Sequence, residues 1–217
     1  MPVQKPLRES QLWKPVSEYL KDLGCLVESY YKSGKPFEFI NVGNAETRLN
    51  VDVYGLQDFN SGSTRHPKAL AVEVKARRDR LLFNDLLQAS KYGRVAHRCY
   101  LAQPCEFDRR AIQESQQVGV GLLKIGKVGR KFIVTLITES KRFEPDPREF
   151  DKFLKRALNI GACSFCRSYG LRYPPTNDSD RLNNLAFKDE NGKTRHQWVC
   201  RKCQLVIKKI ASTPIDG

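Results

Sequence analysis

The sequence lacks the long apolar runs that would place it in a membrane or a secretory pathway. No stretch approaches the roughly 20 apolar residues that a membrane-spanning helix needs. The first ten residues, MPVQKPLRES, contain no apolar core of a signal peptide. Internal repeats are also absent, and 40% hydrophobic with 29% charged residues is a globular rather than a disordered composition. We therefore expect a cytoplasmic protein without a membrane partner.

A disulfide framework is not expected either. The seven cysteines are an odd number in a chain without a secretion signal. Three of them are scattered, and we expect these to be small buried hydrophobic residues: Cys25, Cys99 and Cys105. The other four form two C-x2-C pairs, CSFC and CRKC. Four thiolates at this spacing are typical of closed, tetrahedral and therefore structural Zn²⁺ coordination by Cys163, Cys166, Cys200 and Cys203.

The sequence around these cysteines predicts a small domain that a metal holds together. Residues 188–210 have the pattern of a β-hairpin with its turn at Asn191-Gly192, followed by the second cysteine pair and a strand. This pattern is similar to a zinc ribbon, which has few apolar side chains and needs such a staple. Two alternatives stay open. His196 could displace one cysteine ligand, and C-x2-C pairs also occur in redox sites.

Acidic residues are scarce relative to basic ones. The chain has 38 Lys and Arg against 24 Asp and Glu, a net charge of +14. Residues 1–150 carry 25 and 18, or +7, while residues 151–217 carry 13 and 6, also +7 in less than half the length. Such an excess usually indicates a polyanionic partner, most often nucleic acid. A surface that only favours solubility is the alternative.

Hydrophobic periodicity predicts an α/β domain with a mixed sheet before residue 140. We expect helices over 9–24, 79–95 and 107–119, and strands over 25–31, 37–42, 48–57, 69–76, 97–104, 120–125 and 132–138. In the strand 48–57, alternation sets Leu49, Val51 and Val53 against Asn50, Asp52 and Tyr54. In the second helix we expect Leu82, Leu86 and Leu87 to face inward. Two prolines and dense charge over 139–149 mark a domain boundary, and 147–161 predicts a short basic helix.

One strand that is otherwise apolar carries two charges. In ALAVEVKARR, residues 69–78, Glu73 and Lys75 share a strand face with small alanines. If the strand 48–57 pairs with it, Asp52 comes beside Glu73. Two adjacent carboxylates repel each other unless a cation lies between them, and oxygen ligands suit Mg²⁺ or Mn²⁺. A lysine beside such a metal can position a water or offset phosphate charge, which indicates phosphodiester hydrolysis. The wet face of an edge strand is the alternative.

Four segments resemble the PD-(D/E)xK, or restriction-endonuclease-like, nuclease superfamily: the helix ESQLWKPVSEYLKDLG, VDV at 51–53, VEVKARRD at 72–79 and FNDLLQA at 83–89. That family has a helix with an acidic residue, a hairpin bearing Asp and then Glu-x-Lys, and a helix that often contains Gln. Val51 stands where many members have proline. The resemblance covers roughly residues 9–138.

The resemblance implies roles for individual residues. Asp52, Glu73 and the Val74 carbonyl would bind Mg²⁺ or Mn²⁺, and Lys75 would orient the attacking water. Glu9 would be an outer ligand reached through water, and Gln88 would hydrogen-bond near the site. For these last two, helix capping or ordinary surface polarity is the alternative. A further set of basic side chains could reach flanking phosphates: Arg77, Arg78 and Arg80.

Together these patterns predict a metal-dependent DNA endonuclease. Residues 1–140 would form a restriction-endonuclease-like mixed sheet flanked by helices, 141–160 a linker with the basic helix, and 161–217 a zinc ribbon. Two other functions stay open: a non-catalytic nucleic-acid-binding protein on the same fold, or an assembly factor that recruits partners through the ribbon. Many members of the family cut as dimers, so a homodimer is a family-level expectation.

Overall fold

The computed structural model describes residues 7–29, 37–40, 48–59, 67–77, 81–158, 160–171 and 182–212. Within them the protein is a mixed α/β structure, as the sequence predicts. The chain divides into two compact units, residues 1–57 with 68–150 and residues 58–67 with 151–217. In the described part of the chain, no helix has the length and apolar character to cross a membrane.

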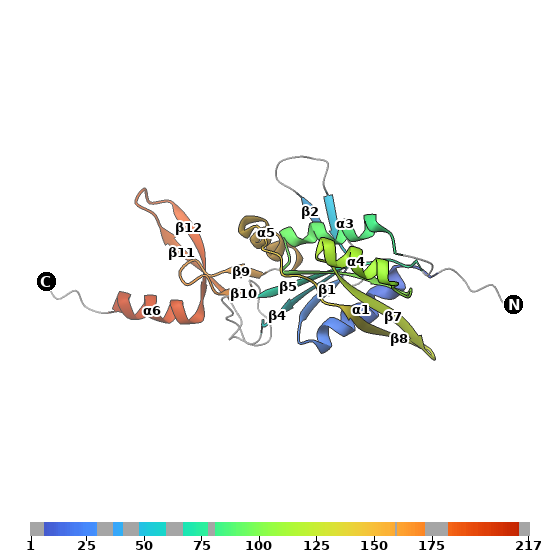
Figure 1. The fold of residues 1–217 in the computed structure, drawn as a ribbon. Coiled ribbons are helices and arrows are strands. Elements are labelled where there is room, and N and C mark those ends of the chain that lie inside the picture. The colour runs from blue at the N-terminus through green and yellow to red at the C-terminus, as the bar shows by residue number, and fades with distance from the viewer. Residues whose placement is uncertain are drawn as a thin grey trace. The chain divides into compact units, whose positions relative to one another are not determined.

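A six-stranded mixed sheet forms the centre of the first unit (Figure 1). Its strands, in spatial order, are β1 Leu26–Ser29, β4 Val53–Gln57, β5 Lys68–Val74, β6 Arg98–Gln103, β7 Gly121–Val128 and β8 Lys131–Thr138. Strands β5, β6 and β7 are parallel, and the other neighbours are antiparallel. A separate hairpin pairs β2 Phe37–Ile40 with β3 Arg48–Val51. The carboxyl ends of β5, β6 and β7 therefore share one edge of the sheet.

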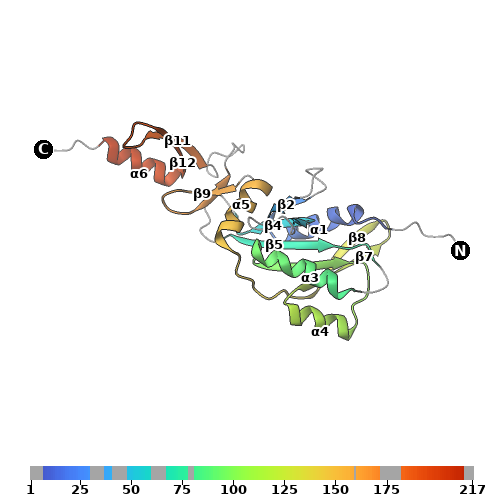
Figure 2. The same cartoon turned by 90° about the horizontal axis from the view of Figure 1, so that it is seen from above.

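Helices cover both faces of this sheet (Figure 2). Helix α1, Ser10–Asp22, belongs to the same buried cluster as the β5 residues Leu70, Val72 and Val74. On the opposite face lie α3, Phe83–Lys91, with the 3-10 turn η1, Tyr92–Arg94, and α4, Arg109–Val118. Because side chains alternate along a strand, Glu73 points to the face that carries α3.

The strand predicted over 48–57 is in fact two strands, because the chain bends at Asp52. Before the bend, β3 pairs with β2, and after it β4 pairs with β1 and β5. The expected grouping of Tyr54 with polar positions is also wrong. Both faces of β4 are covered by helices, so Tyr54 is fully buried, and its hydroxyl donates to the Val95 carbonyl at 2.7 Å.

The inward position of Leu87 is a further wrong prediction, since its side chain is 38% exposed. Helix α3 instead turns Asp85, Leu86 and Ala89 inward. The three scattered cysteines are buried as predicted: Cys25, Cys99 and Cys105. Helix α4 begins where Asp108 accepts a hydrogen bond from the Ala111 N–H at 2.7 Å, a typical N-cap.

The second unit contains two small hairpins and a helix. Strand β9, Ile160–Ala162, pairs with β10, Tyr169–Leu171, and β11, Leu182–Lys188, pairs with β12, Thr194–Cys200. Helix α5, Pro147–Ala157, precedes them at the junction of the two units, where the sequence predicts a basic helix. The β11–β12 turn contains Gly192 at φ +75°, close to the predicted position.

The prediction of a strand after the second cysteine pair is wrong, because helix α6, Arg201–Ser212, follows β12 directly. The short apolar run Leu205–Ile207 suggested a strand, but the residues around it are mostly good helix formers. The second cysteine pair thus lies at a strand-to-helix junction rather than between two strands.

Candidate functional site

Three charged side chains meet at the carboxyl end of β5. Glu73 lies on this central strand and is only 2% exposed, and Lys75 follows the strand directly. Lys75 Nζ lies 2.5 Å from Glu73 Oε1. Asp52 lies in the bend between β3 and β4, and its Oδ2 accepts a hydrogen bond of 2.8 Å from the Val74 N–H. The structure therefore brings together the three residues that the sequence singles out, and burial of Glu73 excludes a wet strand face.

Val74 has left the regular hydrogen-bond pattern on one side of β5. The next residue, Lys75, donates its N–H to the Ala102 carbonyl of β6 at 3.0 Å. The Val74 N–H points the other way and binds Asp52. Because the N–H and C=O of one strand residue point to the same side, the Val74 carbonyl also faces Asp52.

The two carboxyl groups resist being ionised together. Burial, followed by the charge of Glu73, raises the pKa of Asp52 to about 8, although the Val74 hydrogen bond opposes the shift. Burial also raises the pKa of Glu73, against the attraction of Lys75. For Lys75, burial is the largest influence and lowers the pKa, but attraction to Glu73 and the other acids outweighs it and the net shift is upward. A single ammonium group, that of Lys75, is therefore surrounded by more carboxyl groups than it can neutralise.

Tyr92, which sequence reasoning missed, fixes the position of Glu73. Its hydroxyl contacts Glu73 Oε2 and lies 2.5 Å from the Asn50 carbonyl oxygen. Burial and the charge of Glu73 raise the pKa of Tyr92 far above its usual value, so the hydroxyl stays protonated. One hydroxyl proton serves two acceptors here, and a proton on Glu73 would complete the network. The available signal was the four-residue spacing from Gln88, which places both residues on one side of a helix.

Gln88 and Glu9 both lie near this group. The Gln88 side chain hydrogen-bonds to Tyr92. Glu9 occupies the N-cap position of α1 without making a side-chain capping bond, so the capping interpretation is wrong. Its negative charge acts on the pKa values of Asp52, Glu73 and Lys75. Glu9 is therefore close enough for electrostatic coupling, although these carboxylates do not form a tight three-residue cluster among the described residues.

Of the three predicted phosphate-binding arginines, Arg78 and Arg80 lie outside the described residues. Arg77 Nε lies 3.7 Å from Oδ2 of the buried Asp85 in the first turn of α3. This ion pair connects the segment that follows β5 to the start of α3, the helix that carries Gln88. Arg77 thus has a structural partner as well as a half-exposed side chain.

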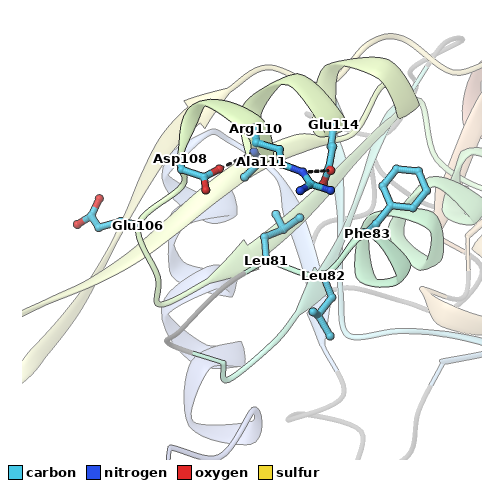
Figure 3. A pocket seen from close by; sticks show the side chains of 8 residues that line it. All are labelled: Leu81, Leu82, Phe83, Glu106, Asp108, Arg110, Ala111 and Glu114. Atoms are coloured by element: carbon cyan, nitrogen blue, oxygen red, sulfur yellow. Dashed lines mark hydrogen bonds and ion pairs between the residues drawn. The ribbon is translucent and has the colours of Figure 1, made fainter.

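A pocket of about 370 Å³ opens between the starts of α3 and α4 (Figure 3). Its lining residues are Leu81, Leu82, Phe83, Glu106, Asp108, Arg110, Ala111 and Glu114. Arg110 is paired with Glu114 at 2.8 Å, and Glu106 forms an ion pair with Lys124, so most of the charges in the lining are compensated. None of the candidate catalytic side chains lines it, so this pocket is separate from the site at the end of β5.

The second unit holds the predicted cysteine cluster. The ligand sulfurs of Cys163, Cys166, Cys200 and Cys203 all lie within 4.8 Å of one another. The Cys166 and Cys200 sulfurs are 3.6 Å apart, far beyond the disulfide length of about 2.05 Å. Zn–S bonds of about 2.3 Å place tetrahedral ligands about 3.8 Å apart. The cluster can therefore hold a metal ion such as zinc.

Backbone groups support the cysteine cluster. The Cys200 N–H donates to Cys163 Sγ at 3.4 Å. Burial is the largest influence on Cys166 and raises its pKa, but hydrogen bonds with Ser168 and with neighbouring thiols outweigh it and lower the value to about 6. The pKa values of Cys200 and Cys203 are raised by burial. His196, the alternative ligand, instead lies 3.2 Å from the Asn184 side chain.

Comparison with known proteins assigns no family. No protein-family model matches the chain, and no curated protein matches it. Among solved structures, the chain is similar to a protein of unknown function from Silicibacter pomeroyi, with 18% sequence identity and a TM-score of 0.42. The match covers 71% of this chain and 87% of the other.

Proposed function

We propose that the protein is a metal-dependent nuclease that hydrolyses phosphodiester bonds in DNA. The observation that carries this proposal is the convergence of Asp52, Glu73 and Lys75 at the end of a buried central strand. Two acids and one base in a site of this kind form a strongly perturbed titratable group, and such groups cluster at functional sites. The resemblance to the PD-(D/E)xK pattern supports the same reaction.

The donor set fits a hard divalent cation. Asp52 and Glu73 offer carboxylate oxygens, and the Val74 carbonyl faces the same side. Burial raises the pKa of both carboxyl groups, and a bound cation would favour their ionised forms. Mg²⁺ or Mn²⁺ held by these residues would supply Lewis-acid stabilisation of phosphoryl charge and acidify a bound water. Glu9 would act at a greater distance through water.

The remaining side chains have distinct tasks. Lys75 can hydrogen-bond the attacking water or offset negative charge on the phosphate, since its ammonium has three donors. Tyr92 holds Glu73 in place, and Gln88 in turn holds Tyr92. Tyr92 and Gln88 are thus positioning residues, because they act through Glu73.

We assign zinc to the cysteine cluster as a structural ion. Four cysteine ligands leave no coordination position for a substrate. Among the described residues, the buried cluster around this site consists of Cys163 and Cys200 with Leu182 and Val199, and a few partly buried apolar side chains pack against it. A metal would supply stability that so few apolar side chains do not.

The alternative of a nucleic-acid-binding protein without catalysis rests on the net charge of +14, which favours binding whether or not a bond is cut. A cleavage assay separates the two. Labelled single-stranded, duplex and branched DNA are incubated with the protein in Mg²⁺, Mn²⁺ or EDTA. The test variant carries Glu73→Gln and Lys75→Gln. The control carries Arg142→Gln and Glu144→Gln, which removes an exposed ion pair of 3.1 Å and the same two charges.

Metal-dependent cleavage by the wild type and the control, reduced to background in the test variant, supports the nuclease. Salt-sensitive binding by all three proteins without any cut product refutes it and supports the binding role. Absence of both binding and cleavage would leave the assembly factor.

A further inference from the structure

Strands β7 and β8 continue beyond the rest of the sheet as a two-stranded arm, visible in Figures 1 and 2. Strand β6 pairs with β7 only from Gly121 to Lys124, whereas the pairing of β7 with β8 continues to Val128 and Lys131. Four residues at about 3.3 Å each extend the arm about 13 Å past β6. We use the term arm for residues 125–134. At its tip Gly129 has a φ of +61°, as a two-residue hairpin turn with glycine in the first position requires.

The arm carries positive charge without acidic neighbours in its own sequence. Residues 121–138 contain four basic residues and no Asp or Glu. Lys124, at the base, forms an ion pair with Glu106. The three at the tip, Lys127, Arg130 and Lys131, are exposed, and no ion pair to any of them is found within the described residues. Three uncompensated cations within five residues create a local field that attracts phosphate.

The arm leaves the sheet at the edge where the candidate site lies. Val74 of β5 pairs with Ala102 of β6, which pairs with Leu123 of β7, so Lys75 is level with Lys124 along the strands. The arm therefore begins where the candidate catalytic strand ends. Two strand spacings of about 4.8 Å sideways and about 13 Å forward place the tip about 16 Å from Lys75.

One face of the arm is continuous with the face that carries Glu73. The ladder pairs Glu73 with Leu101 and Leu101 with Leu122, and alternate residues from Leu122 onward include Val128. Lys131 pairs with Val128 and shares its face. Val128 is 65% exposed and Ile133, on the same face, is 48% exposed. Cations beside exposed apolar groups suit a surface of phosphates, sugars and thymine methyl groups.

We infer that the arm binds double-helical DNA next to the phosphodiester bond that the candidate site would hydrolyse. A two-stranded ribbon fits the major groove, which is about 12 Å wide, and the reach of the tip is of that order. Lys127, Arg130 and Lys131 contact backbone phosphates there, and Val128 and Ile133 lie against the groove. This inference rests on the proposed function, because the arm positions the strand that the site would cut.

Binding of a short DNA duplex, measured by fluorescence anisotropy in EDTA, tests the arm without any cleavage. The arm variant carries Lys127→Gln, Arg130→Gln and Lys131→Gln. The control carries Lys21→Gln, Lys68→Gln and Lys141→Gln, which removes the same charge from exposed positions outside the arm. Both variants are compared with the wild type over a range of salt concentrations.

Loss of three phosphate contacts should reduce the slope of log K against log salt by about 2.7 and weaken binding roughly 10²-fold at about 0.15 M salt. The control should keep the wild-type slope. Arg130→Gln alone should reduce the slope by about 0.9, which guards against a folding defect in the triple variant. Equal slopes in the arm variant and the control would overturn the inference. An equal loss for single-stranded DNA would overturn the assignment of a duplex.

The same proteins separate this inference from the proposed function. If the wild type binds DNA through the arm but never cleaves it, the result supports the inference about the arm and refutes the proposed nuclease activity. If cleavage depends on the metal but binding does not depend on the arm, the result supports the proposed nuclease activity and refutes the inference about the arm.

Discussion

Asp52→Asn should stabilise the metal-free protein while abolishing its activity. The substitution keeps an oxygen that can accept the Val74 N–H bond, and it removes one of the two carboxylates that compete for Lys75. In the folded protein the pKa of Asp52 is raised from 3.8 to about 8. The native state therefore holds a proton that the unfolded chain has released, and stability falls as pH rises between about 4 and 8.

The magnitude follows from the number of protons. One proton of difference changes the free energy of unfolding by about 1.4 kcal/mol per pH unit, or about 3 kcal/mol between pH 5 and pH 7. We expect urea denaturation in EDTA to show this decline for the wild type relative to Asp52→Asn. Groups such as His97 titrate in both proteins, so the difference between the two curves cancels their contribution.

Addition of Mg²⁺ completes the test. At a concentration about 100 times its dissociation constant, a ligand of the native state stabilises it by about 2.7 kcal/mol. The wild type should recover stability at neutral pH, and Asp52→Asn should gain far less. Parallel wild-type and variant curves from pH 5 to 7, unaffected by Mg²⁺, would refute the reasoning about this carboxyl pair.

Two further predictions concern the scaffold and the second unit. Gly121→Ala should destabilise the protein by about 1–3 kcal/mol in urea denaturation, because its Cβ would lie 2.5 Å from Tyr100 and 2.7 Å from the Ser140 nitrogen. In the same strand Gly126→Ala, which meets only a carbonyl oxygen at 3.8 Å, should be neutral or slightly stabilising, and an equal loss in both would contradict the steric argument. A strong zinc chelator should release one metal per chain and change the near-ultraviolet signal of Trp198 without shifting the unfolding of the first unit. Cys25→Ala should keep the metal, and a fully bound ion in Cys203→Ser would contradict the four-ligand site.

Local patterns in the sequence predict much of the first unit. The alternation of helices and strands is confirmed, because each element has a clear period and a turn-forming boundary. The bend at Asp52 was not predicted, because the hydrogen bond that its carboxylate accepts from the Val74 N–H joins residues that are 22 positions apart in the sequence. Helix α6 was mistaken for a strand because a three-residue apolar run fits either structure.

The candidate site shows the same division between local and tertiary information. The spacing of Glu73 and Lys75 is readable along one strand, and the structure brings Asp52 to them. The contact between Tyr92 and Glu73 depends on how η1 packs against the sheet, and the four-residue spacing from Gln88 indicates only that Tyr92 and Gln88 share one side of a helix. The sequence predicts strands over 120–125 and 132–138, but β7 continues to Val128 and β8 begins at Lys131, and the reach of the arm also depends on where β6 stops.

The charge balance at the end of β5 argues for more than a structural ion pair. A buried pair of Lys75 with Glu73 alone would be weak support for any function, because such pairs also occur in purely structural settings. Here a second, half-buried carboxyl, Asp52, has no cation of its own at hydrogen-bonding distance among the described residues, and Glu9 adds further negative charge. A purely structural network would be more stable without the carboxyl group of Asp52, because the Val74 N–H needs only a neutral acceptor. An excess of acid that the fold does not need is the arrangement expected where a cation completes the site.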